Sequence, residues 1–417
     1  MSAKTKGPTG LGFIFVTLLL DVMGVGLIIP ILPQLVQALT ADPTAAARYY
    51  GALFTVFTLM QFLFAPGLGA WSDQIGRKPI LILSLFGATV SYLMMALSPS
   101  LIWLFIARGL AGIAGASLTV ASAYIADVST PETRAQNFGL LGAAFGLGFI
   151  FGPALGGLLG NIDLRLPFYV AAGVSLINAL YGLLAVPESL GMENRRAFTP
   201  SKANPFSWIG LLKRYPVVMG LALTLLMTSL AQNSLHSVWV LFTAYRFHWN
   251  PGQNGLALAF VGVASAIVQG GLIRLIVPKL GERNAVLCGL GISAVSFVLY
   301  GLATQGWMMY AVIALGALGG IAGPAVQGLI ASQVSPDEQG AVQGALASLM
   351  SLTGIVAPLA ASTLFAHFTA PNATLVMPGV SFFLGAILLV LGLANAAWQF
   401  RKHPAPAIPA PAPMAPV

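Results

Sequence analysis

Apolar stretches of about 20 residues, the length that a helix needs to cross roughly 30 Å of hydrocarbon, recur along the whole chain. Short polar segments separate them, and the strict alternation of apolar and polar residues that is typical of a membrane β-barrel does not occur. We therefore predict an all-α polytopic membrane protein with twelve transmembrane helices. Their expected positions are about 11–37, 48–70, 79–98, 101–127, 136–158, 165–186, 216–241, 253–276, 284–303, 308–332, 340–366 and 374–400.

Composition supports this prediction and excludes several kinds of function. Of the 417 residues, 57% are hydrophobic and 7% are charged, whereas a soluble domain carries about 25% charged residues. The single cysteine, Cys288, permits no disulfide framework and no thiolate metal site. The sequence contains no catalytic arrangement of nucleophile and base, no phosphate-binding loop and no cluster of metal ligands, so we expect neither an enzyme nor an ATP-driven pump.

The positions of the positive charges predict how the chain is oriented in the membrane. The formal net charge is +8, and most Lys and Arg residues lie at the termini and in every second loop. Only Arg48, Arg165 and Arg246 lie in the loops on the other side. The positive-inside rule then places both termini in the cytoplasm. The charge is a signal of topology, and we expect no nucleic-acid partner.

The two halves of the sequence resemble each other. A shift of 205 residues aligns 130–139 with 335–344 and Pro153 with Pro358, and it also brings the segment DQIGRK close to PKLGER. Three correspondences at one offset indicate a duplicated six-helix unit, with the two copies related by an axis along the membrane normal.

A long polar stretch divides six predicted spans from the other six, and we interpret it as a cytoplasmic linker. The C-terminal tail is rich in Pro and Ala, a composition that cannot bury a core, so it is expected to be disordered. The expected regions are a cytoplasmic N-terminus at 1–10, a six-helix bundle at 11–186, the linker at 187–215, a second six-helix bundle at 216–400 and the tail at 401–417.

The loop between the second and third spans combines glycines with charges. Asp73 is expected to cap the next helix or to pair with a base, and Arg77 and Lys78 supply the cations. Asp127, at the cytoplasmic end of the fourth span, is expected to reach Arg77. A charge cluster of this kind would act as a latch if it formed in only one conformation. Helix capping and topology alone are the alternative interpretation.

The fifth span carries small residues at intervals of four positions. They are Gly148, Gly152 and Gly156, and Pro153 and Gly157 lie beside them. Small residues let helices approach closely in a membrane, and proline loosens a helix, so we expect an interface that seals or bends. A helix that serves packing alone is the alternative.

Two charged residues lie deep within predicted spans. Asp21 interrupts an apolar run in the first span, and Arg108 is the cation deepest in any span. Intramembrane acids usually face a cavity or a partner and serve proton or ion pathways. Removal from water favours the neutral form of a carboxyl group, and a nearby Arg favours the charged form. We predict that Asp21 carries a proton and that Arg108 modulates it if the two meet; a structural carboxylate and a structural ion pair are the alternatives.

Uncharged polar residues populate other spans, and a cavity near the middle of the membrane needs such donors and acceptors to orient a ligand. His236 can also titrate near neutral pH, although a lone membrane histidine more often bonds a neighbouring helix. The candidate cavity residues are Gln61, Gln232, Asn233, His236, Gln269 and Gln327.

Several of these motifs resemble those of a known superfamily. Gly69, Asp73, Gly76, Arg77 and Lys78 fit the pattern G-x-x-x-D-x-x-G-R-K, which resembles the cytoplasmic signature of the major facilitator superfamily. The segment GLGFIFGPALGG in the fifth span resembles its antiporter motif. Within that superfamily, LMQFLFAPGLGAWSDQIGRKPILILSLFGA looks like the TetA-type tetracycline exporters, and the resemblance runs from about residue 11 to 366.

The resemblance implies a fold of two pseudo-symmetric six-helix bundles and a role for particular residues. Asp21 occupies the family's first-helix aspartate position, Arg108 its fourth-helix arginine position and Gln61 its second-helix glutamine position. Asn233 aligns with a seventh-helix glutamine.

The sequence departs from the family at three further positions. Exporters that handle tetracycline as a metal chelate carry acids in spans three and nine and a histidine in span eight, where this chain has Ser91, Ser293 and Ser265. The loss of these ionisable groups removes the negative charge that attracts a cationic drug–metal complex. We therefore expect metal-chelated tetracycline to be a poor substrate and one proton to be exchanged per cycle.

The resemblance and the residues together predict a proton-coupled antiporter that exports an amphipathic small molecule by alternating access. A metabolite exporter or an uncoupled facilitator of the same fold is the alternative, and a receptor or scaffold is disfavoured because the loops are short. We expect no cofactor, with the proton as coupling ion, and a monomer in the inner membrane of a bacterium with both termini cytoplasmic.

Overall fold

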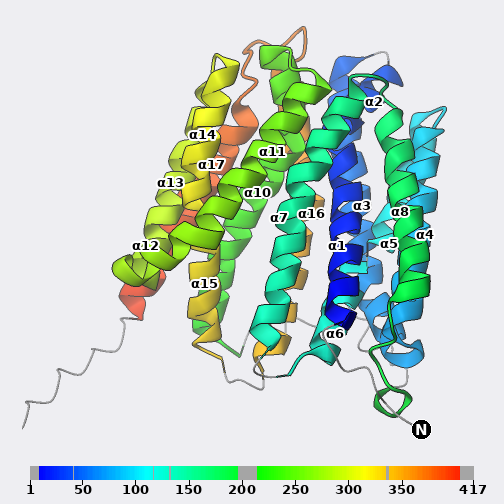
Figure 1. Cartoon of the computed structure of the whole chain (residues 1–417). Helices are drawn as coiled ribbons and strands as arrows, with labels where there is room; N and C mark the ends of the chain where they lie inside the picture. The colour runs from blue at the N-terminus through cyan, green and yellow to red at the C-terminus, as the bar shows by residue number, and fades with distance from the viewer. Residues whose placement is uncertain are drawn as a thin grey trace, which may run out of the picture.

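The computed structural model in Figure 1 describes residues 9–40, 42–115, 117–130, 133–195, 214–334 and 338–403. Over these residues the regular structure is helical, and twelve helices are long and apolar enough to cross a membrane. The predicted fold class is confirmed. The last part of the predicted N-terminus begins α1, and most of the predicted linker and tail, 196–213 and 404–417, lies outside the described residues.

The helices of the N-terminal half are α1 (Thr9–Ile28), α2 (Leu32–Ala38), α3 (Pro43–Ile75), α4 (Arg77–Ala96), α5 (Leu101–Ala114), α6 (Ser117–Val128), α7 (Arg134–Gly160) and α8 (Leu166–Ala185). A short 3₁₀ turn, η1 (Met192–Asn194), follows. Those of the C-terminal half are α10 (Pro216–Phe247), α11 (Pro251–Ile267), the π-helical η3 (Val268–Leu272), α12 (Ile273–Leu280), α13 (Glu282–Leu302), α14 (Gly306–Gly319), α15 (Ala322–Ala331), α16 (Gln339–Phe368) and α17 (Val380–Lys402).

The first predicted span is wrong at its end. We expected one helix over 11–37, but α1 ends at Ile28 and a separate helix, α2, follows after a turn. Pro30 lacks the N–H that would continue the helical ladder, and Pro33 suits the first turn of a new helix. The bounds of the other spans match their predicted positions to within six residues.

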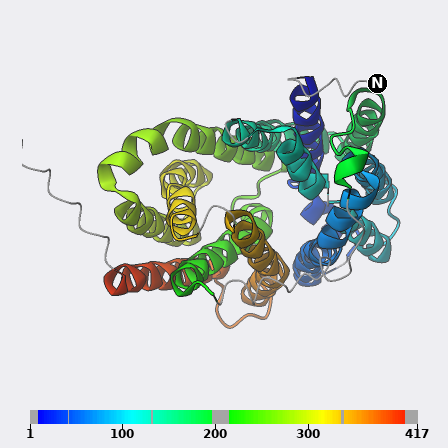
Figure 2. The same cartoon turned by 90° about the horizontal axis from the view of Figure 1, so that it is seen from below.

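Each half has hydrophobic cores of its own. In the N-terminal half, one buried cluster surrounds Tyr124 and another surrounds Phe168. In the C-terminal half, one surrounds Leu290 and another surrounds Phe382. This last cluster also includes Ala47 of α3, so it continues across the boundary between the halves. Figure 2 shows the resulting arrangement as two groups of helices that lie side by side.

Two helix pairs, α3 with α16 and α7 with α11, make the main contacts between the halves. Thr55 of α3 donates a hydrogen bond to the Ile355 carbonyl of α16 over 2.8 Å. Gly157 of α7 packs so closely on Pro251 and Gly255 that an added Cβ would collide with them. We expected a loop over 67–79, but α3 continues to Ile75 and α4 begins at Arg77, so the connection is a tight turn at Gly76. We call this turn the gate loop, the end of the bundle that carries it the gate-loop end, and the opposite end the far end. These contacts between the halves lie towards the far end.

The predicted duplication has a counterpart in the backbone. Gly76 and Gly281 are 205 residues apart, and they precede α4 and α13. Both have positive φ, +113° and +77°, with ψ near 155°, a region that is essentially restricted to glycine. The connections between the second and third membrane spans of each half thus share one turn.

Candidate functional site

A cavity of about 1000 Å³ lies between the two halves. Both halves line it, with aromatic and aliphatic side chains among which polar groups are interspersed. Over the described part of the chain, its wall contains one carboxylate, Asp21, and one permanent cation, Arg108. His236 adds an imidazole. The cavity is thus amphipathic and nearly balanced in charge.

Asp21 projects from α1 into this cavity. Its Oδ2 atom accepts a hydrogen bond of 2.6 Å from the Ser117 hydroxyl, on the first residue of α6. The described residues provide no hydrogen bond to Oδ1. A carboxylate with one protein donor and one open oxygen can exchange a proton or a ligand with the cavity. Sequence reasoning missed Ser117, whose only signal was a hydroxyl in the same span as Arg108.

Arg108 does not pair with Asp21 in this conformation, so the condition for its predicted role is not met here. Its guanidinium carbon lies 4.3 Å from the ring centroid of Phe57 and 5.8 Å from that of Phe54, both on α3. Its Nε atom is buried without a hydrogen-bond partner. Aromatic faces attract a cation, so α5 places the guanidinium against α3 and not against α1. Phe57 was not singled out from the sequence.

Tyr92 of α4 connects the surroundings of the two charges. It lines the cavity together with Asp21 and Arg108, and its side chain packs near Gly24 of α1. A phenol at this position can donate a hydrogen bond to a carboxylate or accept one from a guanidinium after a small movement.

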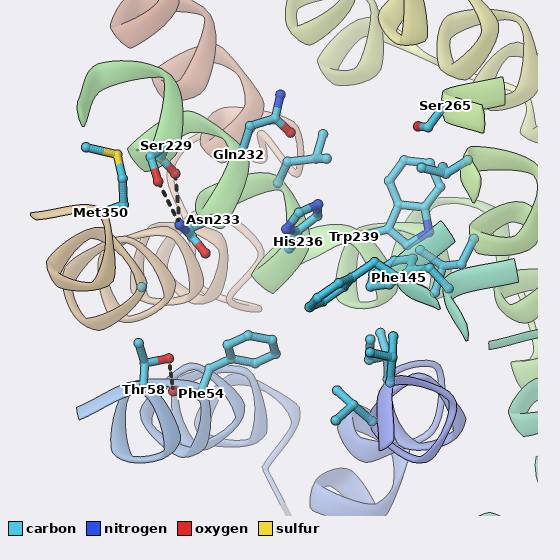
Figure 3. A pocket seen from close by; sticks show the side chains of 18 of the residues that line it. Phe54, Thr58, Phe145, Ser229, Gln232, Asn233, His236, Trp239, Ser265 and Met350 are labelled. Carbon is cyan, nitrogen blue, oxygen red and sulfur yellow. Dashed lines mark hydrogen bonds between the residues drawn. The ribbon is translucent and has the colours of Figure 1, made fainter. Parts of the chain in front are cut away.

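The amide residues of α10 and α3 form much of the polar wall. Asn233 donates hydrogen bonds to the Ser229 carbonyl at 3.0 Å and to the Thr353 hydroxyl at 2.9 Å, and these hold its side chain against α16. Figure 3 shows Asn233 and His236 of α10 on the opposite side of the pocket from Phe54 and Thr58 of α3. The side-chain amide of Gln61 donates a hydrogen bond of 3.1 Å to the Gly115 carbonyl. The predicted cavity residues of α10 and α3 therefore line the same cavity.

Two other predicted cavity residues have different surroundings. Gln269 lines the cavity from the π-helical segment η3, where the helix carries one extra residue per turn. Gln327 is exposed on α15 and is not among the residues that line the cavity. The expectation for Gln327 is therefore corrected: Gly323, on the same face of α15, lines the cavity, but Gln327 lies one helical turn further along, outside the lining.

The three serines at the departing positions all line the cavity. Ser91 is fully buried, and its hydroxyl donates a hydrogen bond of 2.8 Å to the Ala88 carbonyl within its own helix. Ser265 and Ser293 lie on α11 and α13 across the cavity. Hydroxyl groups thus occupy cavity positions where the resemblance leads one to expect ionisable groups. Among the described residues, no three His, Cys, Asp or Glu side chains gather as they would around a metal ion.

The gate loop contains the predicted charge cluster. Arg77 forms an ion pair of 2.5 Å with Asp73 and a hydrogen-bonded ion pair of 3.0 Å with Asp127. Its guanidinium also donates a hydrogen bond of 2.7 Å to the buried hydroxyl of Ser72. The Lys78 ammonium donates to the Leu183 carbonyl at the end of α8. These partners belong to the N-terminal half, so the described contacts of the cluster do not bridge the halves here.

Glu188, which sequence reasoning missed, completes this cluster from the start of the linker. Its carboxylate accepts hydrogen bonds from the backbone N–H groups of Arg77 at 2.9 Å and Lys78 at 3.2 Å, which satisfies the start of α4. The hydroxyl of its neighbour Ser189 donates a hydrogen bond of 3.1 Å to the Asp127 carboxylate. An added Cβ on Gly76 would collide with the Glu188 carboxylate. At Gly69, by contrast, an added Cβ would make only a van der Waals contact of 3.7 Å with Thr119.

The small residues of α7 face two different helices. An added Cβ at Gly148, Gly152 or Gly156 would collide with the backbone or side chains of α1. Gly157 instead faces α11, and the Pro153 carbonyl crowds Gly255 of that helix. The motif therefore joins α7 to its own half and to the other half at once.

Solved structures of low sequence identity share the fold. A bacterial homologue of the human lysosomal transporter Spinster aligns with a TM-score of 0.74 at 18% identity, covering 97% of this chain and 100% of that chain. The human organic anion transporter TETRAN aligns with a TM-score of 0.69 at 24% identity, covering 94% of this chain and 100% of that chain.

Proteins found by sequence comparison have a higher identity to this chain than these solved structures. The profile of the Major Facilitator Superfamily matches residues 14–280 and 221–417. The tetracycline resistance protein of class C from Escherichia coli is 38% identical over 401 residues, which are 94% of this chain and 98% of that protein. The class D protein from Salmonella ordonez is 39% identical over 349 residues, 84% of this chain and 88% of that protein. With this profile match and this identity over nearly its full length, the chain belongs to the major facilitator superfamily and, within it, to the TetA-type family of tetracycline resistance proteins.

Proposed function

We propose that this protein is a proton-coupled antiporter that exports an amphipathic small molecule by alternating access. The observation that carries the proposal is Asp21, the one carboxylate on the described wall of a cavity between two separately packed halves. An acid within a membrane is costly unless it has a function, and exchange of a proton is the function that its open oxygen supports.

The wall of the cavity favours an amphipathic ligand. Aromatic side chains such as Phe145 and Trp239 supply apolar contact, and Gln232, Asn233 and His236 supply hydrogen-bonding groups. The relatives are named for tetracycline resistance, which suggests a drug of that size. The serines at positions 91, 265 and 293 leave Asp21 alone to attract a cation, so a metal chelate of the drug is disfavoured.

The orientation follows from the positive charges. If the positive-inside rule holds, the gate-loop end faces the cytoplasm, as do both termini. Because the main contacts between the halves lie at the far end, this conformation would then admit substrate from the cytoplasm. Separation of α7 from α11 and of α3 from α16 would open the other side.

In this proposal Asp21 takes a proton from outside and gives it up when substrate binds from the cytoplasm. Arg108 modulates this step when a change of conformation brings it near Asp21, and the Asp73–Arg77–Asp127 cluster sets the shape of the gate loop. One proton per cycle supplies about 2.3 kcal/mol per 100 mV, which supports accumulation of about fiftyfold. The protein needs no cofactor in this scheme and works as a monomer in the inner membrane.

The proposal is tested by transport in proteoliposomes loaded with a pH-sensitive dye. Tetracycline, with and without Mg²⁺, is compared with lipophilic cations and neutral drugs for wild type, Asp21→Asn and Asp42→Asn. Asp42 caps α3 in a loop and makes a matched acid-to-amide control. We expect substrate-induced proton flux in the wild type and the Asp42 variant and none in Asp21→Asn.

Two outcomes would overturn parts of the proposal. Movement of labelled substrate without proton flux in the wild type would make the protein a facilitator with a structural Asp21. Tetracycline transport that requires Mg²⁺ would contradict the argument from the three serines, because a chelate would then bind without the additional acids.

A further inference from the structure

The first turn of α11 depends on the opposite half for one of its hydrogen bonds. The first backbone N–H groups of a helix have no partner within the helix, so another group must accept from them. In α11 the side chain of Asn250 accepts from the N–H of Gln253 over 2.9 Å, within the same half. The N–H of Gly252 instead donates to Oδ1 of Asn161 over 3.1 Å. Asn161 is the residue that ends α7, so this bond joins the two halves.

The last turn of α7 lies close enough to α11 to make this bond. An added Cβ on Gly157 or Gly160 would crowd Pro251, the first residue of α11. Gly252 is buried, and an added Cβ there would collide with the side-chain amide of Asn161. Asn161 itself is exposed at the far end. The bond therefore lies at the edge of the contact between the halves, where both of its groups can turn to water when the halves separate.

The helix that makes the other contact between the halves begins with a cap from its own half. Both α3 and α11 start with a capping Asp or Asn that is followed by proline. In α3 the N–H of Thr44, the second residue of the helix, donates to the Asp42 carboxylate over 2.8 Å. Thr44 and Gly252 hold the same position in their helices, but the cap on Gly252 requires that the two halves are together.

We propose that Asn161 is a positioning residue that favours the closed far end through its hydrogen bond to Gly252. This inference rests on the alternating access of the proposed function, and it assigns a residue that sets the balance between the two conformations. A contact that exists in one of two states shifts their equilibrium by its own net free energy. A neutral hydrogen bond corresponds to about a fivefold change in the ratio of open to closed far ends.

A carboxylate in place of the Asn161 amide should strengthen the bond. The N-terminus of a helix carries partial positive charge, and an ionised acceptor makes a stronger hydrogen bond than a neutral one. Asn161→Asp keeps the shape of the side chain, so it should favour the closed far end about threefold more than the wild type does. A residue that only supports the local structure would not shift the balance in opposite directions for alanine and for aspartate.

Two spin labels measure this balance directly. Leu97 and Leu302 are exposed, lie 205 residues apart and end α4 and α13 at the far end, one in each half. Labels are attached to Leu97→Cys and Leu302→Cys in a background with Cys288→Ser, which removes the single native thiol. Double electron–electron resonance on the full chain in nanodiscs, without substrate or pH gradient, gives the ratio of the longer distance to the shorter one.

We expect Asn161→Ala to raise this ratio about fivefold because it removes the acceptor. Gly252→Ala should raise it by a similar factor because it displaces the same side chain. Since both changes break one bond, the double variant should also shift the ratio about fivefold, and not by the product of the two effects. Asn161→Asp should lower the ratio about threefold.

Asp42→Ala is the matched control, since it removes the cap at the same position of α3 without breaking a bond between the halves. Gly291→Ala controls for the added methyl group, because a Cβ there meets nothing within 4 Å. Both variants should leave the ratio of the two distances unchanged.

An unchanged ratio in Asn161→Ala and Asn161→Asp, or a single distance in every variant, would overturn the proposal. An equal shift in Asp42→Ala, or single effects that multiply in the double variant, would overturn it as well. If Gly252→Ala does not fold, the two Asn161 variants still decide. Proton-coupled transport with an unchanged ratio would remove the role of Asn161 and leave the proposed function standing. A shifted ratio without proton flux would support that role and remove the coupling.

Discussion

The loops that precede α4 and α13 have the same backbone turn and very different surroundings. Gly76 and Gly281 both adopt positive φ. Around Gly76 the structure gathers Asp73, Arg77 and Glu188, and a Cβ there would collide with the Glu188 carboxylate. Around Gly281 an added Cβ would meet nothing within 4 Å. The two halves therefore share a backbone, while the charged cluster belongs to one of them.

The same asymmetry holds in the cavity and in the packing of the fifth and eleventh spans. The N-terminal half supplies Asp21 and Arg108, whereas the C-terminal half supplies uncharged amides, serines and His236. Gly156 of α7 corresponds, at the offset of 205 residues, to Ala361 of α16. We infer that the N-terminal half carries the ionic chemistry and the C-terminal half provides hydrogen bonds to the ligand.

The largest effect is expected from a substitution that compares α7 with its counterpart α16. Gly156→Ala gives α7 the residue that α16 has, but the new Cβ collides with the Leu27 carbonyl of α1. Because backbone and not a flexible side chain is in the way, we expect a loss of about 3 kcal/mol in the free energy of unfolding. Ala361→Gly, the reverse change, should cost about 1 kcal/mol. Thermal unfolding in detergent measures both.

Gly146→Ala is the matched control on α7, since an added Cβ there meets nothing within 4 Å. A Gly156→Ala protein as stable as Gly146→Ala would show that α1 and α7 do not pack this closely.

The two glycine turns give the next prediction. Gly76→Ala and Gly281→Ala both place a Cβ in a backbone region that costs about 1–3 kcal/mol for a residue other than glycine. Only Gly76→Ala also displaces Glu188 from the start of α4. We expect the Gly76 variant to be less stable than the Gly281 variant and to lose more transport. Equal losses in unfolding temperature and transport rate would remove the distinction between the loops.

A smaller effect is expected from the cap that the linker provides. Glu188→Gln keeps the shape of the side chain and weakens two hydrogen bonds to backbone N–H groups, which should cost about 1 kcal/mol. Glu282→Gln, at the start of α13, should change stability by less because no described hydrogen bond involves that side chain. The pair is measured by unfolding and by the maximal transport rate. A Glu282 variant with the larger loss would contradict this account of the cap.

The smallest effect concerns ligand affinity in the C-terminal half. Gln232→Ala removes a cavity amide and should weaken binding of a transported substrate about fivefold, the loss of one neutral hydrogen bond. Gln327→Ala, outside the cavity, should leave the dissociation constant unchanged. Equilibrium binding with purified protein measures both, and a larger effect at Gln327 would place the ligand elsewhere.

Sequence reasoning predicted most of the fold because hydrophobic length is a local signal and the repeat can be found by comparing the two halves of the sequence. The twelve spans and the Asp73–Arg77–Asp127 cluster were both within reach. The three serines were singled out through the resemblance, and the structure adds that they line the cavity. The glycine spacing of α7 also predicted close approach, although it did not say that α1 and α11 are the partners.

The rest depends on how helices rotate and on contacts between distant segments. Glu188 caps a helix that begins 111 residues earlier, and no local pattern reports such a contact. Whether Arg108 meets Asp21 or Phe57 is decided by the relative placement of α5, α1 and α3. Gln327 lies one helical turn beyond Gly323, which lines the cavity from the same helix, and the sequence does not show how far along a helix a cavity extends.

The central claim, that Asp21 alone exchanges one proton for the ligand, is tested most directly by proton release on binding. Purified protein in weakly buffered detergent solution is mixed with a transported substrate, and the pH change is calibrated against added acid. The account predicts release of about one proton per bound ligand by the wild type and none by Asp21→Asn. Release of two protons, or equal release by the variant, would contradict it.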